Sequence, residues 1–305
     1  MRHSLLAALL LVAVAAPASA QLRRDDGRVF DRRLPDRIDT TVTIGAGGVV
    51  ALTARQADIL VETGSGNTVR VRANSERGRL RFDASDQRVS LDASDAGGDG
   101  RIQVTVPAGV RVIAQAMDGD ISVRGTGGDV SAHSQSGNVT VENASGHVDL
   151  NTLSGDITAS QLKGTVSANS VSGDVSITGV TGNVSVASVS GSLTLRTVTS
   201  QSVNAQSTSG DVTFDGTIDP AGRYEFATHS GDVSLDIPAG ASAQLTVSTW
   251  SGSIDSDFPI TLQPGEHDIG VATSKRFTFT VGGGEARITA ESFSGDVTIH
   301  HRGNR

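Results

Sequence analysis

The sequence predicts an all-β fold: a single-chain β-solenoid, of the β-helix or β-roll kind, with roughly eighteen to twenty-one residues per coil and two strand-bearing sides. Three observations predict it. A glycine recurs in every nine-residue unit, apolar and polar residues alternate between these glycines, and a longer signature returns in every second unit. Repetition at a fixed period is typical of chains whose copies stack on one another.

The nine-residue units predict short strands joined by turns. In the unit that begins at Gly173, apolar Val175 and Ile177 flank polar Ser176, and the same alternation holds in its neighbours. A period of two indicates a strand with one buried face. Glycine with Asp, Asn or Ser at the unit start favours a turn, because glycine tolerates positive φ. The expected structural turn glycines are Gly119, Gly128, Gly137, Gly146, Gly155, Gly164, Gly173, Gly182, Gly191, Gly210, Gly231, Gly252 and Gly295.

The longer signature is Ser or Thr, any residue, Ser, Gly, and then Asp, Asn or Ser. From Ser134 to Ser188 its step is constant, at two nine-residue units, and beyond Ser188 the steps are longer. We therefore expect two nine-residue sides to form one coil that widens toward the C-terminus. The last step, from Thr249 to Ser292, is about twice as long as the others and predicts two coils, with a degenerate copy at residues 273–279 between them.

The composition limits the possible chemistry. The chain has 36 glycines among 305 residues, 3% aromatic residues and no cysteine. Small residues suit a thin solenoid interior, and the unbroken repeat favours one elongated domain. The lack of cysteine excludes disulfides, thiolate metal sites and a cysteine nucleophile.

Residues 1–20 are typical of a secretory signal peptide. A basic Arg2 precedes an apolar run over residues 5–16, and small residues precede a cleavage site expected between Ala20 and Gln21. The alternative is an uncleaved anchor, for which the apolar run is short. We therefore expect an exported protein, periplasmic or extracellular, with no membrane span in the mature chain. A net charge of -8 argues against nucleic acid or anionic lipid as a partner.

The rest of the chain divides into two expected regions. Residues 21–50 are a charged linker and the start of an N-terminal cap, and residues 51–300 form the solenoid domain. Within it, residues 119–199 hold the regular nine-residue units and residues 200–300 the wider coils.

Two kinds of motif carry a family resemblance. Val-Pro-Ala-Gly at residues 106–109 and Ile-Pro-Ala-Gly at residues 237–240 accompany the repeated Ser-Gly-Asp-Val-Thr. With these motifs, residues 51–300 resemble the bacterial family of secreted β-strand-repeat proteins known as adhesins or as domains of unknown function. The resemblance implies a β-solenoid in a bacterial cell envelope. It implies no chemistry, because a fold alone does not determine function.

The carboxylates at the turns are candidate ligands. As a functional strip they would bind Ca²⁺ or sugar; as structural residues they would form turns. Asn138, Ser192 and Ser253 replace Asp in the same column, which favours the turn interpretation. No unit has the Gly-Gly-x-Gly-x-Asp of a Ca²⁺-binding nonapeptide. The residues concerned are Asp120, Asp156, Asp174, Asp211, Asp232 and Asp296.

The histidines and aromatic residues give weaker signals. His133, His147 and His229 fall in three different columns, which favours incidental surface positions over a metal site. Trp250 and Phe293 share a column with Met117, Leu153 and Val171, and we expect them to fill the interior of the wider coils. The alternative is an exposed Trp250 that stacks on sugar near Tyr224.

The sequence thus predicts a non-enzymatic, secreted or periplasmic cell-envelope protein that presents flat polar faces for adhesion or scaffolding. Two alternatives stay open: a polysaccharide-binding or polysaccharide-cleaving β-helix protein, and a Ca²⁺-dependent adhesin. We expect no catalytic, cofactor-binding or metal-binding residue, and a partner that is an envelope component, a glycan or a protein. Ice binding is disfavoured because the outward positions mix Ser and Thr with Asp149.

Overall fold

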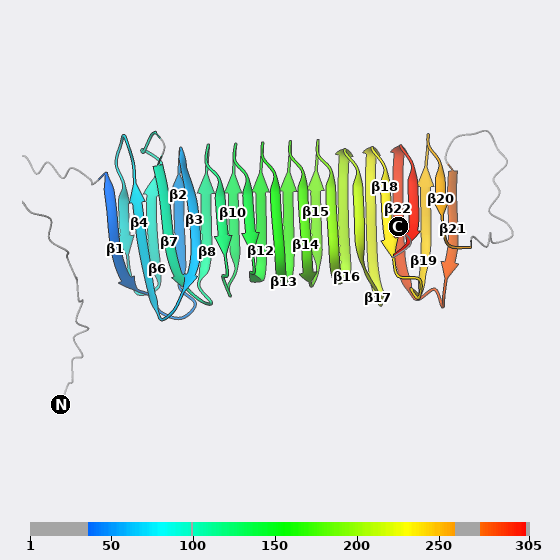
Figure 1. The fold of residues 1–305 in the computed structure, drawn as a ribbon, viewed down its shortest axis with the longest axis horizontal. Helices are drawn as coiled ribbons and strands as arrows, with labels where there is room; N and C mark the ends of the chain where they lie inside the picture. Colours follow the sequence, from blue (N-terminus) through cyan, green and yellow to red (C-terminus); the bar gives the residue numbers. More distant parts are fainter. Residues whose placement is uncertain (1–35, 99, 260–274, 303–305) are drawn as a thin grey trace, which may run out of the picture. The chain divides into compact units, whose positions relative to one another are not determined.

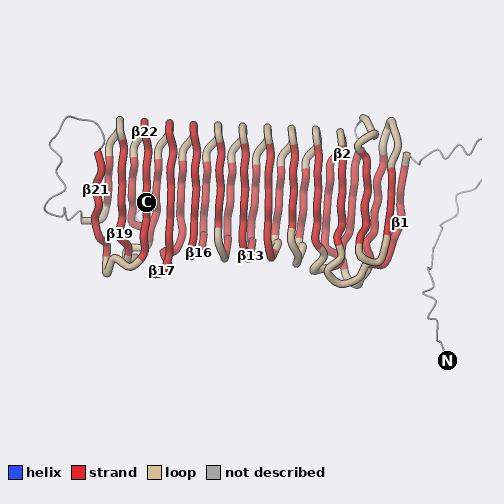
Figure 2. Tube along the Cα trace, turned by 180° about the vertical axis from the view of Figure 1, so that it is seen from behind, coloured by secondary structure: helices blue, strands red, loops and turns tan. Residues whose placement is uncertain are grey.

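The computed structural model describes residues 36–98, 100–259 and 275–302, all within the compact unit of residues 34–305. The signal-peptide prediction, most of the expected linker and the first two residues of the degenerate copy lie outside them. The described residues form 23 strands and no helix (Figure 2), which confirms the all-β prediction. Accordingly, they include no helix that could cross a membrane.

The strands follow the chain in three groups. The N-terminal group is β1 (Arg37–Thr43), β2 (Val49–Ala54), β3 (Ala57–Gly64), β4 (Thr68–Asn74), β5 (Arg81–Ala84), β6 (Arg88–Ala93) and β7 (Gly100–Pro107). The middle group is β8 (Arg111–Ala116), β9 (Ile121–Arg124), β10 (Val130–Ser134), β11 (Val139–Glu142), β12 (Ser145–Thr152), β13 (Ile157–Ser170), β14 (Val175–Thr181), β15 (Val184–Ser188), β16 (Leu193–Ser209), β17 (Val212–Ser230) and β18 (Val233–Ile237). The C-terminal group is β19 (Ala243–Thr249), β20 (Ile254–Ser256), β21 (Lys275–Val281), β22 (Ala286–Ser294) and β23 (Val297–His301).

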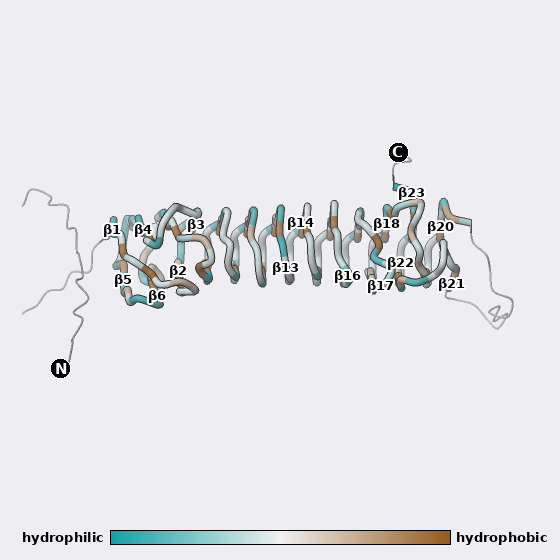
Figure 3. Tube along the Cα trace, turned by 90° about the horizontal axis from the view of Figure 1, so that it is seen from below, coloured by the Kyte–Doolittle hydropathy of each residue, from teal (hydrophilic) through white to brown (hydrophobic). Residues whose placement is uncertain are grey.

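The middle strands form two layers, which Figure 3 shows in a view along the strands. Layer one contains β9, β11 and β14, and layer two contains β8, β10, β12 and β15; β13, β16 and β17 run through both. We call one strand in each layer, with its two corners, a coil. Each coil pairs in parallel with the next, and the partner residues are two nine-residue units apart, as in Val130↔Val148 and Val139↔Ile157.

The core lies between the layers and follows from the alternation in the sequence. Inward side chains such as Val139, Val141, Val148 and Leu150 are fully buried. Each stacks on the inward residue of the next coil, so the same small apolar side chains suit every level. Fully burying a Val or Leu contributes about 1.5–3 kcal/mol.

The register lengthens after β15. The coil that joins β15 to β16 gains one residue, because Val184 pairs with Val203, and the coil in which Val212 pairs with Val233 is longer again by two. Phe214, Tyr224 and Phe226 fill this wider interior, with the Phe214 and Phe226 rings 4.9 Å apart. The Tyr224 hydroxyl donates to Ser200 O at 2.6 Å, and burial raises its pKa.

Coils at both ends are out of chain order. β2 pairs with both β6 and β8, and β3 with both β7 and β9, so the first coil in sequence lies between two later ones. At the other end, β22 and β23 lie between the coil of β17 and β18 and the coil of β19 and β20 (Figure 1). The prediction that the step from Thr249 to Ser292 holds two coils with a degenerate copy between them is therefore wrong, because residues 275–281 form an antiparallel strand instead.

Antiparallel strands close both ends. β1 pairs with β4, β4 with β7, and β5 with β6 at the N-terminal end, and β21 pairs with β19 at the C-terminal end. Residues 275–281, which include most of the predicted degenerate copy, form β21, an edge strand. An antiparallel edge interrupts the parallel stack, which limits its extension by another chain.

Candidate functional site

The Ser-Gly corner, at the signature motif, is held by buried hydroxyls. We call each coil's place in the stack a level. In each coil the first Ser or Thr of the signature donates to the signature glycine's carbonyl oxygen in the preceding level. For example, Thr152 Oγ1 lies 3.1 Å from Gly137 O. This contact explains why the signature begins with a hydroxyl residue, a role that the sequence analysis missed. The donors are Ser134, Thr152, Ser170, Ser188, Ser207, Thr228, Ser292 and Thr249.

The glycines of this corner are required by close backbone approach. A Cβ added at Gly173 would lie 2.0 Å from Gly155 O, and one at Gly155 would lie 2.2 Å from Gly137 O. The positive φ predicted for the turn glycines is wrong at Gly173, which has no left-handed backbone. Among the predicted turn glycines it occurs only at Gly146, Gly164 and Gly182, in the opposite corner.

The turn carboxylates form a ladder with the backbone. The N–H of Asp174 donates to Asp156 Oδ1 at 2.9 Å, and the N–H of Ser192 donates to Asp174 Oδ1 at 2.8 Å. Asn138 accepts in the same way, so any side chain with a suitably placed oxygen serves. Among the described residues, no group of three or more His, Asp or Glu is placed to hold a metal ion.

The opposite corner uses left-handed residues. Asn143, Gln161 and Thr197 have φ of 54–55°, and Gly125 and Gly179 occupy the same column. An open groove crosses this corner, lined by an Arg124–Glu142 ion pair of 3.3 Å together with Asn143 and Gln161. Neither feature has a signal in the nine-residue pattern.

Layer one presents an unbroken hydroxyl ladder. Once the two layers are separated, one outward column contains only Ser and Thr over eight paired strands: Ser122, Thr140, Thr158, Ser176, Thr194, Thr213, Ser234 and Thr298. The irregularity noted in the sequence belongs to layer two, where Asp149 lies. Successive nine-residue units alternate between the two layers, so a comparison of each unit with the next mixes the two outward columns.

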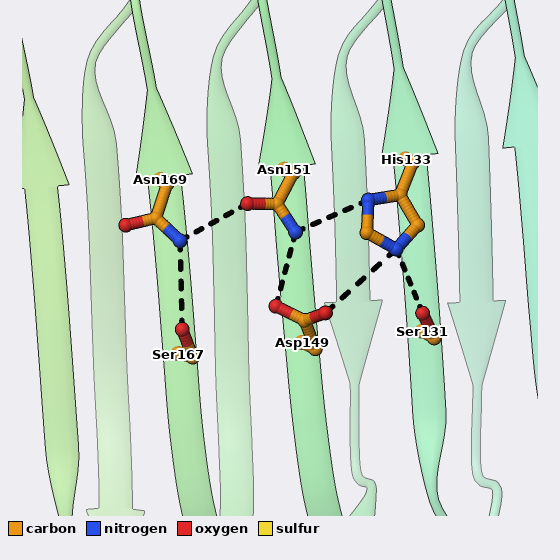
Figure 4. Close-up of polar contacts among 6 residues, drawn as sticks. All are labelled: Ser131, His133, Asp149, Asn151, Ser167 and Asn169. Carbon is orange, nitrogen blue, oxygen red and sulfur yellow. Dashed lines mark hydrogen bonds and ion pairs between the residues drawn. The ribbon is translucent and has the colours of Figure 1, made fainter.

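Layer two presents the polar network of Figure 4. Asn151 Nδ2 donates to Asp149 Oδ1 and lies 3.1 Å from His133 Nδ1, while Asn151 Oδ1 accepts from Asn169. The Asn151 amide is thereby oriented, so His133 Nδ1 is an acceptor and the ring proton is on Nε2.

This tautomer determines what the network can do. Ser131 Oγ lies 2.8 Å from His133 Nε2, an arrangement that resembles a serine nucleophile with its base. A general base needs an unprotonated nitrogen toward the hydroxyl, and here that nitrogen carries the proton. The geometry therefore supports a structural network. The other two histidines considered above lie apart: His147 is bonded through its backbone to Asp129, and His229 stacks on Phe293.

A line of apolar side chains runs along the Ser-Gly corner. We call it the corner ridge; in stacking order it is Met117, Gln135, Leu153, Val171, Val189, Thr208, His229, Phe293 and Trp250. Its large apolar members are 41–52% exposed, so the prediction that Trp250 and Phe293 fill the interior is wrong. They occupy the corner, outside the inward columns.

The aromatic part of the corner ridge is stacked along the coil axis. The rings of His229 and Phe293 are 4.7 Å apart, and those of Phe293 and Trp250 5.7 Å apart, both nearly parallel. Neighbouring rings thus cover most of the faces that a sugar would need. Tyr224 is buried, so the alternative of a sugar site shared by Trp250 and Tyr224 is also wrong.

One family model matches most of the chain. The family model described as Toastrack DUF4097 matches residues 52–300. A solved candidate adhesin from Bacteroides fragilis is 11% identical, with a TM-score of 0.41 over 88% of this chain and 99% of that one. One from Parabacteroides merdae is 12% identical, with a TM-score of 0.41 over 67% and 90%. The comparison with curated proteins gives no match.

Proposed function

The chain belongs to the Toastrack DUF4097 family, and we propose that it is a non-enzymatic cell-envelope protein that presents flat polar faces for adhesion or scaffolding. In this proposal the fold is a β-solenoid with two strand-bearing sides, whose coils widen from two nine-residue units in the middle toward the C-terminal end. Export through the signal peptide of residues 1–20 would place it in the periplasm or outside the cell.

The observation that carries the proposal is the hydroxyl ladder of layer one. Adjacent strands carry the same donor and acceptor group, spaced by the strand separation of about 4.8 Å, although the Ser122 hydroxyl at one end of the ladder is buried. An extended partner could make many weak, equivalent contacts along such a face. A site for a single small molecule would instead gather different groups in one concave place.

Two further observations support a role without catalysis. The turn carboxylates accept backbone hydrogen bonds from the next level, and His133 holds its proton on the nitrogen that faces Ser131. Neither arrangement provides a free base beside a nucleophile. The same backbone ladder makes the Ca²⁺-dependent alternative less favourable, because one oxygen of each carboxylate already accepts a backbone hydrogen bond.

The test is a binding assay that compares variants of layer one with control variants of layer two. We expect the chain without residues 1–20 to bind purified envelope polysaccharide or envelope protein in surface plasmon resonance. Replacing Thr140, Thr158 and Thr194 together by Val removes three hydroxyls from layer one with little change of shape, and should weaken binding at least about tenfold, or about 1.4 kcal/mol. Ser167→Ala with Ser185→Ala on layer two is the control.

The same assay can contradict the proposal. If the wild-type chain binds no envelope fraction, or if it releases a cleaved product from an envelope polysaccharide, the proposed role is wrong. Equal losses in the layer-one and layer-two variants would place the contact elsewhere than on the hydroxyl ladder.

A further inference from the structure

The corner ridge is not used by the proposed function, and it is unusual for an acidic protein. Six of its nine members are large apolar side chains, each at least 41% exposed, while the chain carries a net charge of -8. A row of exposed large apolar side chains marks an interaction surface more often than a solvated one, even with Gln135, Thr208 and His229 among its members. The flanking positions in its middle are also uncharged, as at Asn169, Ser172, Ala187 and Ser190.

We propose that the corner ridge is a self-association surface, on which a second copy of this chain docks side by side and antiparallel. The first argument is the spacing. The ridge presents one side chain per level, about 4.8 Å apart, in a straight line. A second copy has the same spacing, so its side chains stay in step along the whole ridge.

The second argument is the groove beside the ridge. An open groove on the layer-two side is lined by uncharged residues, among them Ala187, Val189, Gln206, Ala227 and His229. The small side chains of Ala187 and Ala227 leave space for the ridge of another copy. A two-fold axis makes such a contact reciprocal, because each ridge then enters the groove of the other.

The groove also sets the position of the two-fold axis. It spans the levels of Asn169, Ala187, Gln206 and Ala227. An axis between Val189 and Thr208 therefore places the groove of one copy opposite the groove of the other. That axis places Leu153 opposite Phe293 of the second copy, an apolar pair, and Val171 opposite His229.

Charge favours the antiparallel direction. The same axis brings Asp118, next to Met117 at the N-terminal end of the ridge, to the level of Lys275 in the second copy. Lys275 pairs with Thr249 on the edge strand β21 and donates to Gly252 O. A parallel pair would instead place Asp118 beside its own copy. The contact would bury on the order of 1,000 Å² in total, close to the lower limit for a specific interface, so we expect a weak dimer.

Sedimentation velocity tests the association. We expect the chain without residues 1–20 to form a weak dimer whose fraction rises with concentration up to about 100 μM, because the interface is small. Val189→Glu puts a charge beside the two-fold axis at an exposed position and should weaken the dimer at least about tenfold. Thr178→Glu, at an exposed position of layer one outside the hydroxyl ladder, is the matched control. A chain that stays monomeric throughout this range, or a Val189→Glu variant that dimerises as well as wild type, would overturn the proposal.

Disulfide trapping tests the direction, because the natural chain has no cysteine. A mixture of Val171→Cys and His229→Cys chains should form a mixed disulfide under mild oxidation, since the axis brings these levels together. Val171→Cys alone should not, because its two thiols would lie three levels, about 14 Å, apart. Efficient trapping of Val171→Cys with itself would overturn the antiparallel arrangement. Loss of glycan binding in Val189→Glu without any dimer would replace the second copy by a glycan.

Discussion

The two corners of each coil share a close backbone approach at their nine-residue glycines but differ in what else they require. At the Ser-Gly corner, glycine is needed because the backbone of the preceding level is too close for a Cβ, and side-chain oxygens hold successive levels together. At the opposite corner, Gly164 and Gly182 approach the preceding backbone as closely but also have positive φ, and Asn143 and Thr197 nearby adopt left-handed φ. The nine-residue spacing therefore reflects two physical requirements, space for the neighbouring backbone and a left-handed φ. Substitutions can separate the two.

The largest effect is expected at Gly173. Gly173→Val adds a β-branched side chain whose Cβ would lie 2.0 Å from Gly155 O, and neither backbone can move without disturbing the stack. We expect a loss on the order of 3 kcal/mol or a failure to fold. The measurement is the free energy of unfolding from a urea titration.

Gly179→Ala is the comparison in the opposite corner, at a glycine outside the nine-residue spacing where left-handed φ occurs without a close backbone approach. Gly179 has φ of 70°, but its nearest atom to a new Cβ is Gln161 N at 3.6 Å, an ordinary contact. Only the backbone preference is lost, at roughly 1–2 kcal/mol. Equal losses at Gly173 and Gly179 would contradict the distinction between the corners.

The next effect concerns the buried hydroxyls of the Ser-Gly corner. Thr152→Val keeps the shape of the side chain but removes the donor to Gly137 O. We expect a loss of about 1–2 kcal/mol, since a buried carbonyl loses its partner. Thr158→Val, on the outer side of layer one, is the control and should change the melting temperature little. A silent Thr152→Val would mean that the hydroxyl does not stabilise the corner.

The middle coils could be predicted because each position stacks on its own copy two nine-residue units later. Val139 with Ile157 and Val148 with Val166 follow directly from that period. The order of coils at the ends could not be predicted by the same means. Both β8 and β6 fit beside β2, and both β19 and β22 present an inward apolar pattern to a parallel neighbour. The alternating pattern shows which strands can stack on one another. It does not show which coil lies next to which, because neighbouring coils need not follow one another along the chain.

The candidate site was less predictable than the fold. Trp250 and Phe293 are large and apolar, which suggested a place in the core. They lie at a corner, however, and the alternation that separates inward from outward side chains applies only within the strands. Thr197 gave no sign of left-handed φ, since β-branched residues rarely adopt it. The hydroxyl ladder was present in the sequence and became visible only when alternate nine-residue units were assigned to different layers.

A smaller effect of opposite sign is expected at Thr197. Its φ of 54° is strained for a β-branched residue, and Thr197→Gly removes that strain. We expect a gain of about 1 kcal/mol after the added chain entropy of glycine. Thr199→Gly, on the same strand but without positive φ, should instead destabilise. A loss at Thr197 as large as that at Thr199 would show that φ is not the constraint at this corner.

The smallest effect concerns the charge on the carboxylate ladder, and it depends on pH. The N–H of Ser253 donates to Asp296 Oδ1 at 2.7 Å, and this hydrogen bond lowers the pKa of Asp296 below its usual 3.8. Because the folded-state pKa is the lower one, the contribution is present above about pH 4 and is lost as pH falls through the folded pKa. Asp296→Asn keeps the accepting oxygen without the charge, so its melting temperature at pH 7 should stay close to wild type. Below about pH 4 the melting temperature of wild type should fall faster than that of the variant, measured by circular dichroism. Parallel acid profiles would mean that the ladder depends on the oxygen atom alone, as the interchange of Asp, Asn and Ser along it already suggests.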